Sequence, residues 1–240
     1  MTLILQKEDA LASLQVSETF VSIQGESTFA GWPCFFIRLT GCNLRCSYCD
    51  TTYAFAGGQP KTISQLVDEF RVLGLTLVEV TGGEPLIQGG TPALLEALQA
   101  ARPGAVVLVE TNGSQDISVV PPGVIAIMDI KCPASGVGRT SGVGRTSGVG
   151  RTSGAGVAFD WQNLERLRPQ DEVKFVISER ADFDWAVRIV NEHAIASKCH
   201  AVLFSPVSGR VEPAMLAEWL MASRVPARLN LQLHKLMGIR

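Results

Sequence analysis

Residues 41–51 have the sequence Gly41-Cys42-Asn43-Leu44-Arg45-Cys46-Ser47-Tyr48-Cys49-Asp50-Thr51, and the interpretation of the whole chain starts from it. The stretch holds three cysteines in the spacing C-x3-C-x2-C, with no histidine or fourth cysteine close by in the sequence. A structural zinc site requires four protein ligands, whereas an iron–sulfur cubane bound by three thiolates leaves one iron open to another ligand. The spacing therefore predicts an open iron–sulfur cluster.

A zinc or disulfide staple is the alternative for these cysteines. A disulfide within so short a loop is geometrically awkward, and a zinc ion would need a distant fourth ligand such as Cys34. The chain has six cysteines without regular pairing, which indicates a reducing compartment. Cys34 and Cys199 lie in apolar runs, and we expect both to be small core residues.

Length and composition favour one large α/β domain with a small substrate. The 240 residues are 46% hydrophobic, and the formal net charge is −2. This charge provides no basic field for nucleic acid. No apolar run approaches the length of a membrane span, and the N-terminus becomes charged too early for a signal peptide or an anchor. We expect a cytoplasmic protein without nucleic-acid or membrane partners.

Apolar periodicity predicts alternating strands and helices, and so a largely parallel sheet. The chain has too few residues for the eight full repeats of a complete barrel, which favours an incomplete (βα) TIM-like barrel. Residues 1–14 form a short extension, helical if structured, and residues 15–240 form the single core domain. The expected strands are 14–22, 34–39, 75–80, 105–110, 124–129, 173–178, 201–204 and 228–233, and the expected helices are 63–70, 92–101, 183–193 and 213–221.

Two local features stand out from this pattern. Arg38 interrupts an apolar strand, and a buried guanidinium needs a carboxylate partner from the protein or from a ligand. Residues 135–156 contain the hexapeptide SGVGRT three times, with few large apolar side chains, which is typical of a flexible loop. A phosphate-binding loop would need a Gly-Lys-Ser/Thr motif that is absent there. We expect the repeat to be dispensable for activity.

The cysteine spacing, with aromatic Tyr48 before the third cysteine, resembles the radical S-adenosylmethionine superfamily. Thr81-Gly82-Gly83-Glu84-Pro85 resembles the superfamily motif that meets the amino group of S-adenosylmethionine. The resemblance implies that Cys42, Cys46 and Cys49 bind a [4Fe-4S] cluster whose open iron is chelated by S-adenosylmethionine. The cluster would reduce the sulfonium of S-adenosylmethionine, which releases a 5′-deoxyadenosyl radical.

Within the superfamily, the chain most resembles the 7-carboxy-7-deazaguanine synthase family. The shared motifs occur in the same order over most of the chain, and their combination is specific. They are Ile23-Gln24-Gly25-Glu26, Arg38 before Gly41-Cys42, Cys49-Asp50-Thr51, Thr81–Pro85, Glu110-Thr111-Asn112-Gly113, Asp129-Ile130-Lys131-Cys132-Pro133 and Leu231-Gln232-Leu233-His234-Lys235.

The resemblance implies roles for individual residues. Thr51 would bind Mg2+, and no residue is assigned as a catalytic acid or base. The S-adenosylmethionine site would contain Tyr48, Asp50, Gly83, Asp129, Ile130, Lys131, Ser205, Pro206 and Val207. The substrate site would contain Ile23, Gln24, Gly25, Glu26, Arg38, Thr81, His234 and the terminal carboxylate of Arg240. Other members can carry a glutamine near Ser205–Val207, where this chain departs from the pattern.

The implied activity is that of a carbon–nitrogen lyase in queuosine and 7-deazapurine biosynthesis. It would convert 6-carboxy-5,6,7,8-tetrahydropterin to 7-carboxy-7-deazaguanine with loss of ammonia. The resemblance also implies a homodimer and a flavodoxin-type or similar reductant. Two alternatives remain: a glycyl-radical-enzyme activase, and a non-catalytic iron–sulfur electron carrier or zinc-stapled binding module. Binding of S-adenosylmethionine would separate the enzymes from the non-catalytic proteins.

Overall fold

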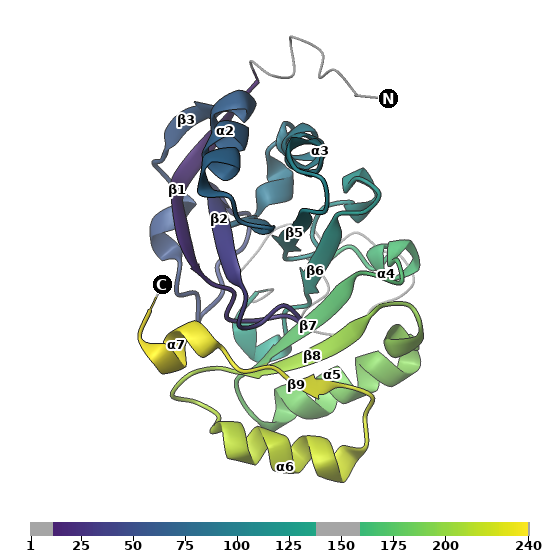
Figure 1. Ribbon diagram of the computed structural model, residues 1–240. Helices are drawn as coiled ribbons and strands as arrows, with labels where there is room; N and C mark the ends of the chain where they lie inside the picture. Colours follow the sequence, from purple (N-terminus) through teal and green to yellow (C-terminus); the bar gives the residue numbers. More distant parts are fainter. Residues whose placement is uncertain (1–11, 138–158, 240) are drawn as a thin grey trace, which may run out of the picture.

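The fold is built on one mostly parallel sheet, as a computed structural model of the chain shows for residues 12–137 and 159–239 (Figure 1). In these residues the sheet has nine strands in the order β3-β1-β2-β4-β5-β6-β7-β8-β9. Strand β1 runs antiparallel to β2 and β3, and every pair from β2 to β9 is parallel. Because β3 and β9 do not pair, the sheet is a partial barrel, which confirms the predicted fold class.

The strands and helices alternate along most of the chain. The strands are β1 (Ser13–Ile23), β2 (Pro33–Leu39), β3 (Gln59–Thr62), β4 (Leu77–Gly82), β5 (Val106–Thr111), β6 (Ile125–Asp129), β7 (Glu172–Ile177), β8 (Ala201–Pro206) and β9 (Arg228–Leu229). The helices are α2 (Ile63–Leu73), α3 (Thr91–Ala101), α4 (Asn163–Arg166), α5 (Arg180–Glu192), α6 (Pro213–Ser223) and α7 (Leu233–Met237). Short 3-10 helices are Thr52–Phe55, Pro85–Ile87, Ile117–Val119, Pro133–Ser135 and Ile195–Ser197.

Helix α2 shows how local sequence fixes an element. Thr62 and Gln65 form a capping box at its start, and Gly74 ends it in the left-handed conformation. Its apolar residues recur at helical spacing and are buried against the sheet and α3; they are Ile63, Leu66, Val67 and Phe70. The helix therefore covers the outer face of the first strands.

Successive side chains along a strand point alternately toward the helices and toward the barrel interior, and the two sets differ in character. Residues facing the helices are apolar and belong to one large core, for example Val78 and Val80 on β4. Residues facing the barrel interior change from apolar to polar along each strand, as in Leu77, Glu79 and Thr81. The same change occurs from Leu108 to Glu110 on β5 and from Ile127 to Asp129 on β6, so the polar groups gather near the carboxyl ends of the strands.

The structure corrects three expectations about the elements. The strand expected at 228–233 ends at Leu229, because Asn230 bonds to β8 and Leu233 N then donates to Gly25 O at 2.9 Å. Strand β3 and the helices α4 and α7 were not expected, and all three are short. Strand β1 begins at Ser13, inside the expected 1–14 extension. The rest of that extension and most of the 135–156 repeat lie outside the described residues.

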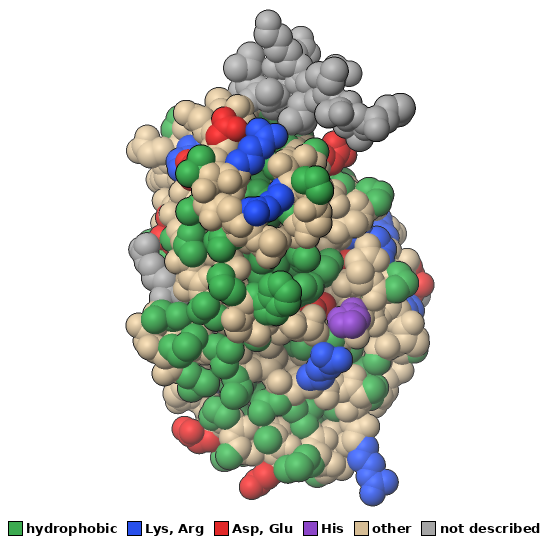
Figure 2. Space-filling model, viewed as in Figure 1, with side chains coloured by type: hydrophobic (Ala, Val, Ile, Leu, Met, Phe, Trp, Pro, Cys, Tyr) green, Lys and Arg blue, Asp and Glu red, His purple; other side chains and the backbone are tan. Residues whose placement is uncertain are grey.

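The surface carries exposed apolar side chains on α6, including Met215 and Met221. Figure 2 shows hydrophobic surface in the lower part of this face, where Figure 1 draws that helix. Leu216 is the buried residue of α6, so the helix contacts the sheet along a narrow side. Within the described ranges, no helix has the length and apolar character that crossing a membrane requires.

Candidate active site

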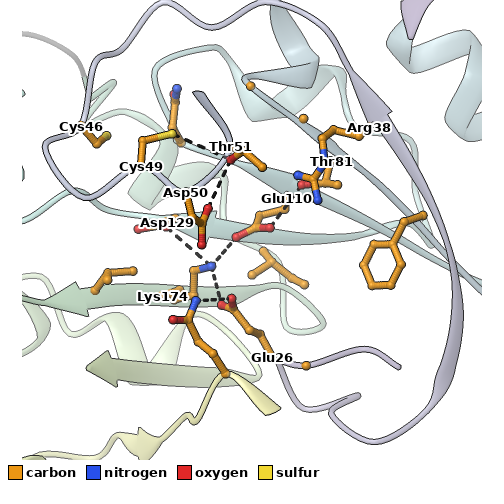
Figure 3. A pocket seen from close by; sticks show the side chains of 18 of the residues that line it. Glu26, Arg38, Cys46, Cys49, Asp50, Thr51, Thr81, Glu110, Asp129 and Lys174 are labelled. Carbon is orange, nitrogen blue, oxygen red and sulfur yellow. Dashed lines mark hydrogen bonds and ion pairs between the residues drawn. The ribbon is translucent and has the colours of Figure 1, made fainter. Parts of the chain in front are cut away.

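A cavity of about 390 Å3 lies at the carboxyl ends of the parallel strands (Figure 3). The cluster loop, residues 41–51, forms one side of it, and the inward polar residues of β2, β4, β5, β6 and β7 form its floor. The segment between β1 and β2 and helix α7 complete the wall. Polar groups from distant parts of the sequence thus face one enclosed volume.

The cluster loop is held against the turn after β4 by close backbone packing. Glu84 N donates to Gly41 O at 2.7 Å, and a Cβ on Gly83 would overlap that carbonyl and the Cys42 side chain. Glu84 is fully buried and accepts from Thr111 Oγ1 at 2.8 Å and Asn112 N at 2.6 Å. Burial raises the pKa of Glu84, and these donors partly oppose it. Gly83 is therefore required by the approach of two backbones.

The three cysteines of the loop are free thiols that line the cavity. Burial raises the pKa of Cys42, and it raises that of Cys46 to about 11. No fourth cysteine is among the described lining residues, so the donor set is three soft ligands, as an open [4Fe-4S] cluster requires. In residues 12–137 and 159–239, no three His, Cys, Asp or Glu side chains already stand at the separation of a bound metal ion.

A second anchor fixes the cluster loop to the segment after β6. Ser47 N donates to Ser135 O at 2.7 Å, and Ser47 Oγ donates to Ala134 O at 3.2 Å. Asp182 on α5 is buried and accepts from Ala134 N and Ser178 N, both at 3.0 Å. The position of the cysteines therefore depends on β6 and α5 as well as on β4.

Two buried polar atoms beside the cysteines have no hydrogen-bond partner among the described residues. They are Tyr48 OH and Asp129 Oδ1. Asp129 Oδ2 accepts from Lys131 Nζ at 2.6 Å, and Lys131 Nζ lies 5.8 Å from the centre of the Tyr48 ring. Burial would lower the pKa of Lys131, but Asp129, together with Tyr48 and Cys46, holds that pKa above its usual value. Unpaired buried atoms next to three thiols fit a site built for a polar cofactor.

Thr51 and Asp50 form a small oxygen-rich corner at the end of the cluster loop. Thr51 Oγ1 lies 3.8 Å from Cys49 Sγ and donates to Asp50 Oδ1 at 3.3 Å. Lys235 Nζ on α7 pairs with Asp50 Oδ2 at 2.7 Å. Burial would raise the pKa of Asp50, but the Lys235 contact lowers it below its usual value. A hydroxyl and an ionised carboxylate are oxygen ligands of the kind that Mg2+ prefers.

The floor of the cavity contains a buried lysine among carboxylates, which Figure 3 shows with dashed lines. Lys174 Nζ contacts Glu26 Oε2 at 2.7 Å and Asp129 Oδ2 at 3.6 Å, and it also bonds to Glu110. Thr81 Oγ1 donates to Glu110 Oε2 at 3.3 Å. The charges of several strands therefore meet at one ammonium group.

Beside this lysine, the carboxylate that Arg38 requires is supplied by the protein. Arg38 Nε donates to Glu18 Oε1 at 3.0 Å, and Tyr53 OH donates to the same oxygen at 2.7 Å. Gln24 is buried, and its amide is used at both ends: Nε2 donates to Glu79, and Oε1 accepts from Glu26 N at 2.9 Å. Gln24 therefore connects the first loop to strand β4.

Most of the residues predicted for the site line this cavity. They are Ile23, Gln24, Gly25, Glu26, Arg38, Cys42, Cys46, Tyr48, Cys49, Asp50, Thr51, Thr81, Gly83, Asp129, Lys131, Val207 and His234. Ile130 instead lies in the core, and Ser205 is buried where its Oγ accepts from Asn230 Nδ2 at 2.8 Å. Pro206 ends β8 and is not a lining residue, and Arg240 lies outside the described residues.

Several polar lining residues were given no site role from the sequence. Among them are Glu79, Glu110 and Lys174; Glu18, Tyr53, Ser208, Gln232 and Lys235 are others, and Glu110, Gln232 and Lys235 had been matched to family motifs without a role. The first three interrupt apolar strands in the same way as Arg38 does. Applying that signal to β4, β5 and β7 would have found them.

Comparison with known proteins places the cluster loop inside a recognised sequence pattern. Residues 36–125 match the family model of the Radical SAM superfamily. The chain is 45% identical over 224 residues to the 7-carboxy-7-deazaguanine synthase of Chlorobaculum tepidum, an alignment that covers 93% of this chain and 94% of that protein. It is 39% identical over 236 residues to the synthase of Koribacter versatilis, covering 92% and 96% respectively.

A solved structure shows the same fold at lower sequence similarity. The crystal structure of QueE from Escherichia coli matches with a TM-score of 0.71 and 22% sequence identity. The match covers 92% of this chain and 95% of that chain. The likeness therefore includes the whole partial barrel.

Proposed function

The chain belongs to the 7-carboxy-7-deazaguanine synthase family of radical S-adenosylmethionine proteins, and from this premise we propose that it converts 6-carboxy-5,6,7,8-tetrahydropterin to 7-carboxy-7-deazaguanine with loss of ammonia. This is a carbon–nitrogen lyase reaction in queuosine and 7-deazapurine biosynthesis. The observation that carries the proposal is the similarity along 93% of the chain to a curated synthase. The activase and the electron carrier are not favoured.

The protein's own part in this reaction is to bind, orient and enclose. Cys42, Cys46 and Cys49 would bind the [4Fe-4S] cluster, which with S-adenosylmethionine supplies the radical that abstracts a hydrogen atom from the substrate. Gly83 lets the turn after β4 approach the cluster loop. The unpaired Asp129 Oδ1 offers an acceptor beside the thiols. The enclosing walls keep the bound substrate away from water.

The substrate would lie on the opposite side of the cavity floor from the cysteines. Arg38, Thr81 and Glu26 stand there, with Gly25 and His234 at the wall. A reduced pterin with a carboxylate presents ring N–H donors and an anionic group, and this floor offers carboxylate acceptors and guanidinium donors. Thr51 and Asp50 would bind Mg2+ between the cluster loop and the substrate, where the ion would hold an anionic group in place.

We also propose the remaining features that the family implies. The protein would act in the cytoplasm as a homodimer with a flavodoxin-type or similar reductant. All six cysteines are free, which supports a reducing compartment.

The test is an anaerobic assay with the cluster reconstituted. Reductant, Mg2+, S-adenosylmethionine and 6-carboxytetrahydropterin are supplied, and 7-carboxy-7-deazaguanine is measured by mass spectrometry. We expect product from the native chain and none from Cys46→Ala, which also loses bound iron. Cys199→Ala is the matched control, because Cys199 is a buried core thiol and should leave iron content and turnover unchanged. Cleavage of S-adenosylmethionine without product would contradict the pterin assignment.

A further inference from the structure

Lys174 is a buried lysine that neither the sequence motifs nor the comparisons single out. It lies on β7 with its side chain 4% exposed, and its ammonium group faces the cavity floor (Figure 3). Three carboxylates from three different segments reach it: Glu26 after β1, Glu110 on β5 and Asp129 on β6. A buried ammonium group requires such compensation, but one or two partners would suffice for that alone.

Removing Lys174 would take away a cationic partner of these carboxylates. Asp129 has a second cation in Lys131, whereas within the described residues Glu26 and Glu110 form their ion pairs with Lys174. Burial would raise the pKa of Glu26, but Lys174 outweighs it and holds that pKa below its usual value. Without Lys174, Glu26 would remain buried beside a second carboxylate and without this cation, which favours uptake of a proton by Glu26.

The two glutamates are also fixed in orientation. Glu26 Oε1 accepts from Gln232 Nε2 at 2.7 Å, while its other oxygen meets Lys174. Glu110 uses one oxygen for Thr81 and the other for Lys174. Each carboxylate therefore has a set direction and lines the cavity, and an ionised carboxylate can accept further hydrogen bonds at its two oxygens but donates none. A reduced pterin offers matching amino and ring N–H donors.

We infer that Lys174 is a positioning residue that keeps Glu26 ionised and holds both Glu26 and Glu110 toward the N–H donors of the pterin substrate. The inference rests on the proposed function and names the groups that select its substrate. Other charged or titratable groups around this cluster are Arg38 on β2, Glu79 on β4, Asp129 and Lys131 at β6, and His234 on α7. Lys174 is the member that contacts both glutamates.

The first test compares Lys174→Gln, which removes the charge, with Lys174→Arg, which keeps it. We expect Lys174→Gln to raise the KM for 6-carboxytetrahydropterin roughly tenfold to a hundredfold near pH 7, the effect of losing a charged hydrogen bond. The deficit should shrink as the pH rises and Glu26 ionises again. Lys174→Arg should lack this pH dependence. Lys198→Met, at an exposed pair with Glu165, is the control.

The second test needs no substrate and therefore separates this inference from the proposed function. The free energy of unfolding of Lys174→Gln, relative to the native chain, should fall between about pH 5 and pH 8. The reason is that a carboxyl whose folded pKa is raised destabilises the fold as the pH rises through that pKa. The free energy of unfolding of Lys174→Arg should vary with pH in the same way as that of the native chain. A KM change that is equal in both variants, or a stability difference that does not vary with pH, would overturn the inference.

Discussion

Glu79 is a residue whose protonation state the fold sets. It is buried on β4 beside Gln24, which donates to it. Burial raises its pKa well above the usual value, nearby Glu110 raises it further, and Lys174 opposes them. The fold therefore favours the neutral carboxyl form of this side chain, which glutamine matches in shape.

Glu79→Gln should therefore stabilise the protein in a pH-dependent way. Below about pH 4.5, the ordinary glutamate value, the two proteins should have equal free energies of unfolding, because Glu79 is then neutral in both folded and unfolded states. Above that pH, folding of the native chain must either protonate Glu79 or bury a charged carboxylate, and both cost free energy. Glu79→Gln avoids this cost, so its free energy of unfolding should be higher by roughly 1–3 kcal/mol. Urea unfolding at several pH values measures this, with exposed Glu165→Gln as the control. Parallel curves for the native chain and Glu79→Gln would show that Glu79 is ionised.

At this scale the sequence predicted some residues well and others not at all. The spacing of three cysteines within eight residues is enough to predict them as cluster ligands. Cys34 is in the core as expected. Lys174 and Glu110 are single polar residues in apolar strands, and their importance depends on strand register. Asp129 pairs with Lys174 across β6 and β7, a neighbour relation between residues 45 positions apart that no local pattern contains.

At the scale of elements, α7 forms a wall of the cavity through one close contact. Leu233 N donates to Gly25 O at 2.9 Å, and a Cβ on Gly25 would overlap the His234 ring and come within 3.0 Å of its backbone nitrogen. The start of α7 and the segment after β1 therefore touch backbone to backbone. A side chain at position 25 must push the helix away.

Gly25→Ala should thus weaken substrate binding more than stability. Displacing α7 moves His234 and Lys235 from the cavity wall, so we expect the KM for the pterin to rise about tenfold, the cost of one or two polar contacts. Binding of S-adenosylmethionine should change little. Gly89→Ala is the matched control, because its Cβ would meet nothing within 4 Å. Unchanged pterin kinetics in Gly25→Ala would mean that α7 does not contact the substrate site.

The same contact explains why the end of the chain was mispredicted. The apolar spacing of residues 228–233 is that of a strand. However, Leu233 N donates its hydrogen bond to Gly25 O and not to a neighbouring strand. Strand β3 was missed because Gln59–Thr62 contains a proline and no apolar alternation. Its pairing with β1 comes from tertiary contact, whereas α2, with its cap and apolar stripe, was predictable from its own residues.

At the scale of the molecule, alternating strands and helices were enough to predict a partial barrel. This alternation does not predict which contacts connect the first hairpin with the later strands. The loop between β1 and β2 crosses from the first hairpin to β7, where Thr28 N lies 3.2 Å from both oxygens of Glu172 and Thr28 Oγ1 donates to one of them. Glu172 is fully buried, so this contact joins two distant parts of the sheet through a buried carboxyl.

Thr28→Val should test how far this closure stabilises the whole fold. Valine keeps the shape but removes the hydroxyl, and leaving a buried carboxyl short of a donor costs about 1–3 kcal/mol in the free energy of unfolding. Burial already raises the pKa of Glu172 and Thr28 opposes that, so the variant should raise it further. The stability deficit should therefore grow as the pH rises above about 4.5, the ordinary value for glutamate. Thr28→Ser keeps the hydroxyl and should remain near native stability. If both variants unfold at the same denaturant concentration, the hydroxyl does not hold the hairpin, and packing of the loop alone closes the barrel.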